Sequence, residues 1–489
     1  MFEFDLAISV SDLLLMLPEI LLLGLVCLVL ILDFSFRKMS KEVLAWITIA
    51  GLCGVLMSLV WMFAAGIHGS LFKQMFLLDP FAVFFKIVVV VSTILVLLSS
   101  HDYIKRIYLF RGEFYVMIML AALGMLFMAS ANDLLSMFIT IEFSTFGFYV
   151  LVAYLREDDL RSSEAGLKFF VLSVFTAAIM VFGISLIFGE TGTIIFSELA
   201  ASRPVMTGGL VIGFLCLLVG LGFKIGAVPF HNWIPDIYQG APTPITAYLS
   251  VAPKAAALAV VLRVFFSTFG EFKPEWVWLV IGMAALSMTY GNVVAIAQKD
   301  IKRLLAYSGI AQMGNILIGL AAGTKMGGDS VLFYLLAYLV ANLGAFAVVI
   351  VFSNLTGSDQ IDDYSGLARR SPILAAAMLV FLLSLAGVPP LAGFIAKIYV
   401  FAAAMREGLI TLVIIGLINI VISMYYYLVV VKKIYIGEPT DHRPIPVSVP
   451  MKVVVYATVI GTVVIGVYPK PFIDWAVAST SLFAHLVGP

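Results

Sequence analysis

Charged residues are scarce in this sequence. Lys, Arg, Asp and Glu make up 12% of its 489 residues and 62% are hydrophobic, whereas a typical soluble domain has about 25% charged residues. The formal net charge is zero and no basic residues cluster into a patch, which argues against nucleic acid as a partner. This composition excludes an ordinary soluble domain and indicates an integral membrane protein.

Cysteine is also rare, and the sequence has no cofactor motif. Cys27, Cys53 and Cys216 stand singly in apolar segments, without the paired spacing that holds zinc or an iron–sulfur cluster. The run from Gly220 to Ile225 superficially resembles a dinucleotide-binding loop, but its sixth position is isoleucine and no strand precedes it. We therefore expect no metal and no cofactor in this chain.

Basic residues are missing from the N-terminus. The first twelve residues carry three acids and no Lys or Arg, unlike a cleaved signal peptide, so the first apolar run is expected to be retained.

Long polar segments are missing too. No loop is long enough for a soluble domain, and any function must therefore lie in or against the membrane.

Long apolar runs fill the rest of the sequence. A bilayer core of about 30 Å needs roughly 20 helical residues, and fourteen runs of that kind are present. Their approximate limits are 13–32, 43–64, 80–99, 113–131, 133–155, 166–188, 208–230, 243–266, 276–297, 303–322, 330–352, 372–404, 409–431 and 452–468. The sequence therefore predicts an all-α integral membrane protein with about 14 transmembrane helices.

The loop lysines and arginines predict the orientation. If the N-terminus lies outside, most of them fall in inner loops, as positive residues do in membrane proteins. The outer loops and tail then hold only Lys73, Arg203, Lys273, Lys325, Arg406 and Lys470. We expect a multi-pass membrane protein with both termini on the outer side.

A carboxylate and two lysines lie deep inside predicted spans. Burying an ionisable group in a membrane costs free energy, so each of these residues is a candidate functional residue. Glu142 has no charged residue within eight positions on either side, so it must be protonated, hydrated or paired with a cation on another helix. Burial disfavours the charged form of Lys224 and Lys254, whereas a nearby carboxylate favours it. Moving such a partner could make the amine bind or release a proton. A static structural ion pair is the alternative.

Other basic residues within the spans have weaker signals. Lys168 follows Glu164 by four residues, which favours a local helix-surface pair. Lys397 lies in the twelfth span without a local acidic partner. Arg263 is close enough to a helix end to extend its charge to the surface, and Lys86 follows Asp79 by seven residues on one side of a helix.

Two spans contain matching interruptions. The sequence GAVPFH includes Gly226 and Pro229 in the seventh span, and AGVPPLAG includes Pro389 and Pro390 in the twelfth. Proline removes a helix hydrogen bond, and the freed carbonyl groups are tolerated only against protein or water. A simple kink is the alternative at either site taken alone. His231, beside the first break, is a possible proton carrier or a structural residue.

The positions of these breaks predict an internal repeat. Helices 4–8 and 9–13 form two groups of five, and the fourth helix of each, 7 or 12, is the broken one. An odd number of helices inverts the second group relative to the first, as in inverted-repeat transporters. We expect four parts: N-terminal helices 1–3 in residues 1–112, the first five-helix repeat in 113–270, the second, inverted repeat in 271–435, and helix 14 in 436–489.

Four longer motifs are specific to a family: EAGLKFFVLSVFTAAIMVFGISLIFGETG, GLGFKIGAVPFHNWIPDIYQGAPTPITAYLSVAPKAAA, QKDIKRLLAYSGIAQMGNILIG and LAGVPPLAGFIAKIYVF. Together they resemble subunit N of proton-pumping NADH–quinone oxidoreductase, respiratory complex I, in the antiporter-like subunit family. The resemblance covers most of the chain. It implies a fourteen-helix fold with two inverted repeats, and proton translocation coupled to quinone reduction elsewhere in the complex. NADH, FMN, iron–sulfur clusters and quinone are then expected in other subunits, and the partners are the neighbouring membrane and peripheral subunits.

The resemblance also assigns a proton relay. It implies this role for Glu142, Lys168, Lys224, Lys254 and Lys397, which match the family's buried glutamate and lysines. Gln312 stands where related antiporter-like subunits often carry histidine, and glutamine cannot titrate. A subunit of a multisubunit sodium/proton antiporter or of a membrane-bound hydrogenase is the alternative transport function. A non-transporting scaffold, in which buried charges only lock helices together, is another.

Overall fold

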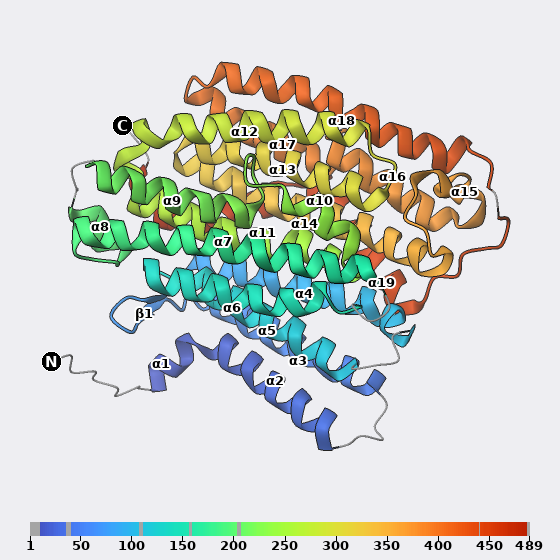
Figure 1. The fold of residues 1–489 in the computed structure, drawn as a ribbon, viewed down its shortest axis with the longest axis horizontal. Coiled ribbons are helices and arrows are strands. Elements are labelled where there is room, and N and C mark those ends of the chain that lie inside the picture. The colour runs from blue at the N-terminus through green and yellow to red at the C-terminus, as the bar shows by residue number, and fades with distance from the viewer. Residues whose placement is uncertain are drawn as a thin grey trace.

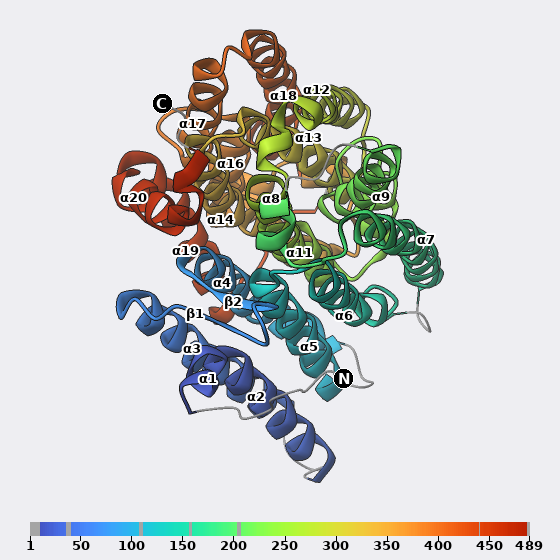
Figure 2. The same ribbon diagram turned by 90° about the vertical axis from the view of Figure 1, so that its left-hand side faces the viewer.

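The computed structural model describes residues 10–35, 41–106, 111–155, 159–202, 207–439 and 441–486. Its long helices run side by side in one common direction (Figure 1), and a view turned by 90° shows many of them nearly end-on (Figure 2). Within these residues, thirteen helices are long and apolar enough to cross a membrane. A helix satisfies its own backbone hydrogen bonds, as a segment surrounded by lipid must. The predicted all-α membrane architecture is confirmed.

The thirteen continuous helices coincide with thirteen of the predicted spans. They are α2 (Leu17–Ser35), α3 (Lys41–Ala64), α4 (Pro80–Arg106), α5 (Arg111–Ser130), α6 (Leu134–Val152), α7 (Leu160–Thr191), α9 (Gly208–Ile225), α11 (Thr243–Leu262), α12 (Lys273–Ile296), α13 (Ile301–Ala322), α14 (Lys325–Thr356), α18 (Ile410–Ile436) and α19 (Val449–Val467). The remaining predicted span, 372–404, is divided between α16 (Pro372–Ala386) and α17 (Ala392–Arg406).

Shorter elements connect these helices. The α-helical ones are α1 (Val10–Leu15), α8 (Phe196–Ser202), α10 (Trp233–Gly240), α15 (Leu367–Arg370) and α20 (Lys470–Ser479). A π-helical turn, η1 (Arg263–Thr268), extends α11, and three 3₁₀ turns are η2 (Gly270–Phe272), η3 (Ile361–Tyr364) and η4 (Ser481–Leu486). Strands β1 (Gly69–Leu71) and β2 (Phe76–Leu78) pair antiparallel, with Ser70 opposite Leu77.

The centre of the bundle is formed by α11, α13 and α14, whose side chains are almost all buried. Helices α2 and α3 lie at one edge, and α4 and α5 separate them from the centre (Figure 2). The outer faces of α2 and α7 expose many apolar side chains. These faces suit a lipid or protein environment, whereas polar groups in α11, α13 and α14 must find partners within the protein.

The two predicted helix breaks are present and have the same backbone pattern. Gly226 caps the end of helix α9 and Gly387 caps the end of α16, both with positive φ angles, of 71° and 89°. At each glycine, its own N–H and the next N–H bond back to the last turn, which is a common helix stop. A proline follows three residues later, at Pro229 or Pro390, and its peptide bond is cis. The chain then resumes as α10 or α17.

The seventh span differs from its predicted limits. It was expected to end near residue 230, but it resumes as α10 and continues to Gly240. Helix α10 contains Asp236 and Gln239, so its sequence is too polar for an apolar-run criterion. Packing against α7 and α13 compensates for that polarity. Residues 1–9 and 487–489, and Arg37, Lys38, Arg156 and Arg203, on which the predicted orientation partly depends, lie outside the described residues.

Candidate functional site

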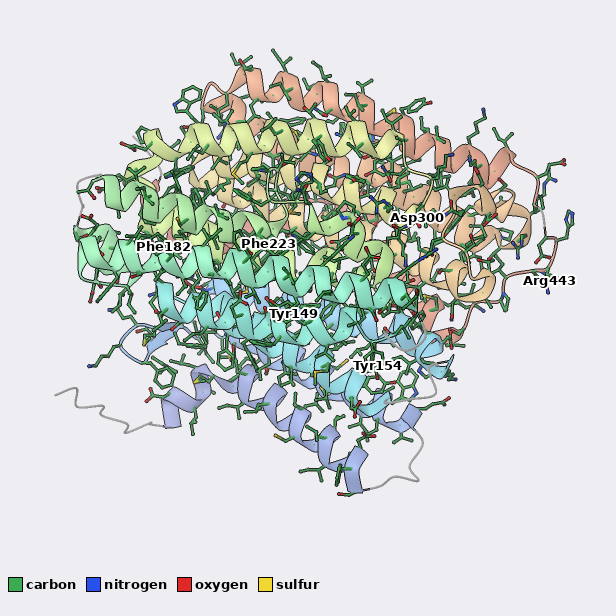
Figure 3. All side chains as sticks on the ribbon, in the orientation of Figure 1. Tyr149, Tyr154, Phe182, Phe223, Asp300 and Arg443 are labelled. Atoms are coloured by element: carbon green, nitrogen blue, oxygen red, sulfur yellow. The ribbon has the colours of Figure 1, made fainter. Side chains whose placement is uncertain are left out.

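Glu142 and Lys224 form an ion pair between α6 and α9. The distance from Lys224 Nζ to Glu142 Oε1 is 3.0 Å, and the side chains are 11% and 17% exposed, respectively. Phe223, the residue before Lys224, lies about midway along the bundle, whereas Arg443 lies at its end (Figure 3). The carboxylate that the sequence left without a local partner therefore meets one of the lysines with which it was expected to interact.

Lys224 has further partners. Its Nζ also donates hydrogen bonds to Thr145 Oγ1, at 2.9 Å, and Ser173 Oγ, at 3.0 Å. Thr145 lies one turn after Glu142 on α6, and Ser173 lies on α7, which packs against α9. Because an ammonium group has three N–H donors, these oxygens and the carboxylate can satisfy all of them. The site is built to hold a charged lysine at its carboxylate.

Lys254 has very different surroundings. It lies on α11, is fully buried, and its Nζ has no hydrogen-bond partner among the described residues. The ring of Tyr238, from α10, lies 5.6 Å from Nζ, within reach of a cation–π interaction. Burial without an anion favours the neutral amine, while the aromatic ring gives limited support to the ammonium ion. Lys254 therefore lacks the fixed counter-charge that Lys224 has.

Lys397 is held by the second helix break. Its Nζ donates to the carbonyl oxygens of Leu385 and Ala386, both at 2.9 Å. These residues end α16, so their carbonyl groups lack the partners that a continuing helix would supply. The break thus creates the acceptors for the lysine that follows it on α17.

Gln312 connects this break to α13 and α14. Its Nε2 donates to Leu385 O at 2.9 Å and lies 3.4 Å from the Tyr427 hydroxyl, and its Oε1 accepts from the Tyr334 hydroxyl. The Tyr427 hydroxyl also bonds to Ser308 Oγ. A non-titrating amide therefore stands at the centre of a buried hydroxyl network. Sequence reasoning singled out Gln312 but missed these hydroxyl groups, because tyrosine in an apolar helix carries no distinctive pattern.

Lys168 lies apart from the buried lysines. It pairs with Glu164 at 2.7 Å, as the four-residue spacing predicted, and with Asp236 of α10 at 3.0 Å, and its side chain is 43% exposed. Asp236 also pairs with Arg303 of α13 at 2.9 Å. This group links α7, α10 and α13 at a polar part of the surface. Nearby, burial raises the pKa of Asp300, which caps α13.

His231 lies inside the first break. It is buried, and its ring packs edge-on against Tyr290 of α12, with 4.5 Å between the ring centres. Neither ring nitrogen has a hydrogen-bond partner among the described residues. The ring is not held by a carboxylate or by one of the buried lysines.

Two further buried ion pairs lie outside the predicted relay. Lys86 Nζ lies 2.6 Å from Glu19 of α2, and both side chains are essentially inaccessible. Arg263 does not reach the surface as expected, but makes two hydrogen bonds to Asp79, at 2.9 and 3.1 Å. That expectation was wrong because helix α4 brings Asp79 beside the end of α11. Glu19, an acid in an otherwise apolar run, was the signal that could have revealed the first pair.

The buried lysines follow neighbouring helices through the bundle. Lys224 is on α9, Lys254 on α11 and Lys397 on α17, and α9 packs on α11, α11 on α13, and α13 on α17. Hydroxyl groups bond to the first of these lysines, from Thr145 and Ser173, and further hydroxyl groups surround Gln312, which shares an acceptor with the third. No group of three or more His, Cys, Asp or Glu side chains that could hold a metal ion occurs among the described residues.

Comparison with known proteins defines the class of this chain. The family model for the transmembrane part of the NADH:quinone oxidoreductase/Mrp antiporter proteins matches residues 131–423. A chain of the Mrp complex from Dietzia sp. has the same fold, with a TM-score of 0.87 at 19% identity, covering 98% of this chain and 100% of that one. The protein is therefore a membrane-embedded antiporter-like subunit.

Two closer comparisons identify the family. NADH-quinone oxidoreductase subunit N of Heliobacterium modesticaldum is 43% identical over 470 residues, covering 96% of this chain and 98% of that protein. A chain of respiratory complex I from Thermus thermophilus has a TM-score of 0.81 at 31% identity, covering 94% of this chain and 99% of that one. The chain belongs to the NADH-quinone oxidoreductase subunit N family, and the resemblance found in its sequence is confirmed.

Proposed function

We propose that this chain is a proton-translocating membrane subunit of respiratory NADH–quinone oxidoreductase, complex I, and works with the enzyme's other subunits. Membership of the subunit N family and the similarity to a chain of complex I support this function. Quinone reduction in other subunits supplies the energy. NADH, FMN, iron–sulfur clusters and quinone bind those subunits, and this chain contributes proton-carrying side chains.

The Glu142–Lys224 pair carries this proposal. The carboxylate stabilises the ammonium form of Lys224 in a buried place where a lone charge would be costly. A signal from a neighbouring subunit that draws Glu142 away, or protonates it, removes this stabilisation. Lys224 then releases its proton. Thr145 and Ser173 keep the lysine in position during the exchange.

Lys254 and Lys397 continue the path. Lys254 has no fixed anion, so it can accept a proton and pass it on. Lys397 receives it, and the carbonyl groups of Leu385 and Ala386 stabilise the resulting ammonium ion. Lys168 and His231 have less central places in the relay. Lys168 lies in a partly exposed ion network, and His231 lies within the first break.

The proposed organisation is two inverted five-helix repeats, residues 113–270 and 271–435, preceded by residues 1–112 and followed by 436–489. Corresponding contacts support it. Helix α5 packs on α6 as α12 packs on α13, and α7 packs on α9 and α10 as α14 packs on α16 and α17. We further propose that both termini face the periplasm in a bacterial inner membrane, on the basis of the loop lysines and arginines.

A sodium/proton antiporter or hydrogenase subunit is the alternative transport function. The likeness to the Mrp chain concerns the fold alone, whereas relatives about 40% identical over nearly the whole chain are named subunit N. These relatives favour the complex I function. Purification of the chain together with iron–sulfur and quinone-binding subunits that oxidise NADH would distinguish the two.

Neutralising the ion pair tests the proposed mechanism. Glu142→Gln and Lys224→Ala should each lower the number of protons pumped per NADH oxidised by the assembled complex in proteoliposomes. Glu407→Gln, which removes a partly exposed partner of Lys273, is the matched control and should leave this ratio unchanged. Normal pumping by an assembled Glu142→Gln or Lys224→Ala complex would refute the relay.

A further inference from the structure

An apolar pocket opens on the outer face of the bundle, where α9 and α12 begin. Its volume is about 160 Å³, and its walls come from the first turns of these two helices and from the turns that follow α11. Among the described residues that line it, every side chain except Glu275 is apolar. Val211, Leu215 and Leu279 line the pocket and are exposed. The pocket is therefore accessible from the membrane around the bundle.

The aromatic walls of this pocket are fixed by their own contacts. The Phe214 ring packs edge-on against Phe265 and Phe269, with 5.5 and 5.0 Å between ring centres, and Trp276 packs edge-on against Phe265 at 5.0 Å. Trp276 Nε1 donates to Phe269 O at 2.8 Å. The N–H of Phe269 bonds to Val264 O and closes the π-helical turn η1, a kind of turn that is frequent at functional sites. The pocket is therefore a preformed cavity.

The pocket lies near the level at which the membrane meets water. Helix α12 belongs to one of the spans, and its first residue, Lys273, pairs with Glu407 at 2.8 Å between partly exposed side chains. Trp278, in the second turn of α12, is 71% exposed, and tryptophan is enriched at membrane–water interfaces. An occupant of this pocket therefore needs an apolar part for its walls and a polar head for its rim.

Glu275 determines which polar head fits. It is the one charged residue among the described residues that line the pocket, its side chain is exposed, and it has no ion pair within the described part of the chain. Its carboxylate attracts an ammonium group. A primary ammonium ion has three N–H donors for charge-assisted hydrogen bonds, whereas the quaternary ammonium of choline has none. Glu275 therefore favours an ethanolamine headgroup.

We propose that the pocket binds one phospholipid with an ethanolamine headgroup, whose acyl chain lies against Phe214, Trp276 and Leu279 and whose ammonium group pairs with Glu275. The chain gains no hydrophobic free energy on leaving the bilayer, because lipid is equally apolar. It gains the contacts that the walls of an empty pocket would forfeit, and the ion pair selects the headgroup. The bound lipid links α9 to α12, which belong to the two proposed repeats. None of the described lining residues is a buried lysine, so the site does not depend on the proton relay.

Photo-crosslinking in the assembled complex tests this site. The complex is placed in nanodiscs that contain a small share of a phospholipid with a diazirine in its acyl chain and either an ethanolamine or a choline headgroup. Mass spectrometry then locates the labelled residues. The ethanolamine lipid should label the walls, at 211–215 and 276–279, about two- to fivefold more than the choline lipid, the factor expected for an exposed ion pair. Equal labelling by the two lipids, or no labelling of the walls, overturns the inference.

Two variants separate the roles of the walls and the rim. Leu279→Trp fills the pocket and should lower labelling of the walls roughly tenfold, because the chain loses about ten carbon–carbon contacts. Leu286→Trp, two turns later on α12 and 56% exposed, is the matched control and should keep normal labelling. Glu275→Gln should abolish the preference for ethanolamine, whereas Glu198→Gln, at an exposed acid on α8, should keep it. Normal labelling in Leu279→Trp, or an unchanged preference in Glu275→Gln, overturns the inference.

A cryo-EM map of the assembled complex in the same lipids distinguishes a lipid from a protein occupant. The wild type should show chain-shaped density along Phe214 and Trp276, with its head beside Glu275, and this density should be absent in Leu279→Trp. An empty pocket, or a side chain of a neighbouring subunit inside it, overturns the inference. These results leave the proposed function standing, because that function is tested by proton pumping in Glu142→Gln.

Discussion

Gln312 and Lys397 donate hydrogen bonds to the same acceptor, the carbonyl oxygen of Leu385, each over 2.9 Å. That carbonyl is available because α16 ends one residue later, at Ala386, and is capped by Gly387. The helix break therefore joins a neutral amide on α13 to an ionisable lysine on α17. The helix break thus supplies a hydrogen-bond acceptor that residues from two other helices share.

Replacing Gln312 by leucine should destabilise the chain. The variant leaves the buried Tyr334 hydroxyl without its acceptor, at a cost of about 1–3 kcal/mol. Gln312→His retains a donor and an acceptor and should be closer to the wild type. The measurement is the temperature at which this subunit dissociates from the detergent-solubilised complex. Equal dissociation temperatures for Gln312→Leu and the wild type would show that the shared network contributes little.

The sequence predicted the helices well because each membrane crossing needs a long apolar run, and such runs are visible without any tertiary information. The breaks at Gly226 and Gly387 were also visible, since glycine and proline act through local geometry. The ion-pair partners of the buried charged residues could not be predicted from the sequence. Lys86 pairs with Glu19, sixty-seven residues away, and Arg263 with Asp79. Only helix packing determines which buried charges meet, and α10 was hidden because its polar residues are satisfied by α7 and α13.

A double-mutant cycle on Glu142 and Lys224 separates a relay from a scaffold. Lys224→Met leaves a largely buried carboxylate without its cation and should cost about 3 kcal/mol, by comparison with other broken buried pairs. Adding Glu142→Gln removes that carboxylate charge and should restore most of the stability. Subunit dissociation temperature measures this effect.

Pumping by the same variants gives the second readout. If the pair carries protons, the double variant should assemble normally and still fail to pump, because neither residue can titrate. A double variant that recovers both assembly and pumping would favour the scaffold.

Removing Lys254 should affect transport without harming stability. Its amine is fully buried and has no anion or hydrogen-bond partner among the described residues, so Lys254→Met removes a costly polar group. We expect an unchanged or higher dissociation temperature and a roughly 100-fold lower rate of proton transfer through this chain. Lys452→Met, at an exposed position on α19, is the control and should change neither quantity. A clear loss of stability in Lys254→Met would indicate that the lysine has a structural role instead.

The Asp79–Arg263 pair should behave as a structural link between α4 and α11. Arginine stays protonated, and its two hydrogen bonds to Asp79 fix the geometry, so the pair is unsuited to carrying protons. Asp79→Asn keeps the acceptor that caps α4 at Ala82 but leaves Arg263 buried without an anion, at a cost of about 3–5 kcal/mol. Adding Arg263→Met should recover much of that loss.

The yield and dissociation temperature of the assembled complex check this prediction, and protons pumped per NADH should match the wild type in every variant that assembles. Asp159→Asn removes the charge of an exposed capping residue on α7 and is the matched control. A lower pumping ratio in the assembled Asp79→Asn, Arg263→Met complex would contradict the structural role. It would instead extend the proton path from Lys254 along α11 toward the N-terminal helices, because Arg263 follows Lys254 on that helix and its turn.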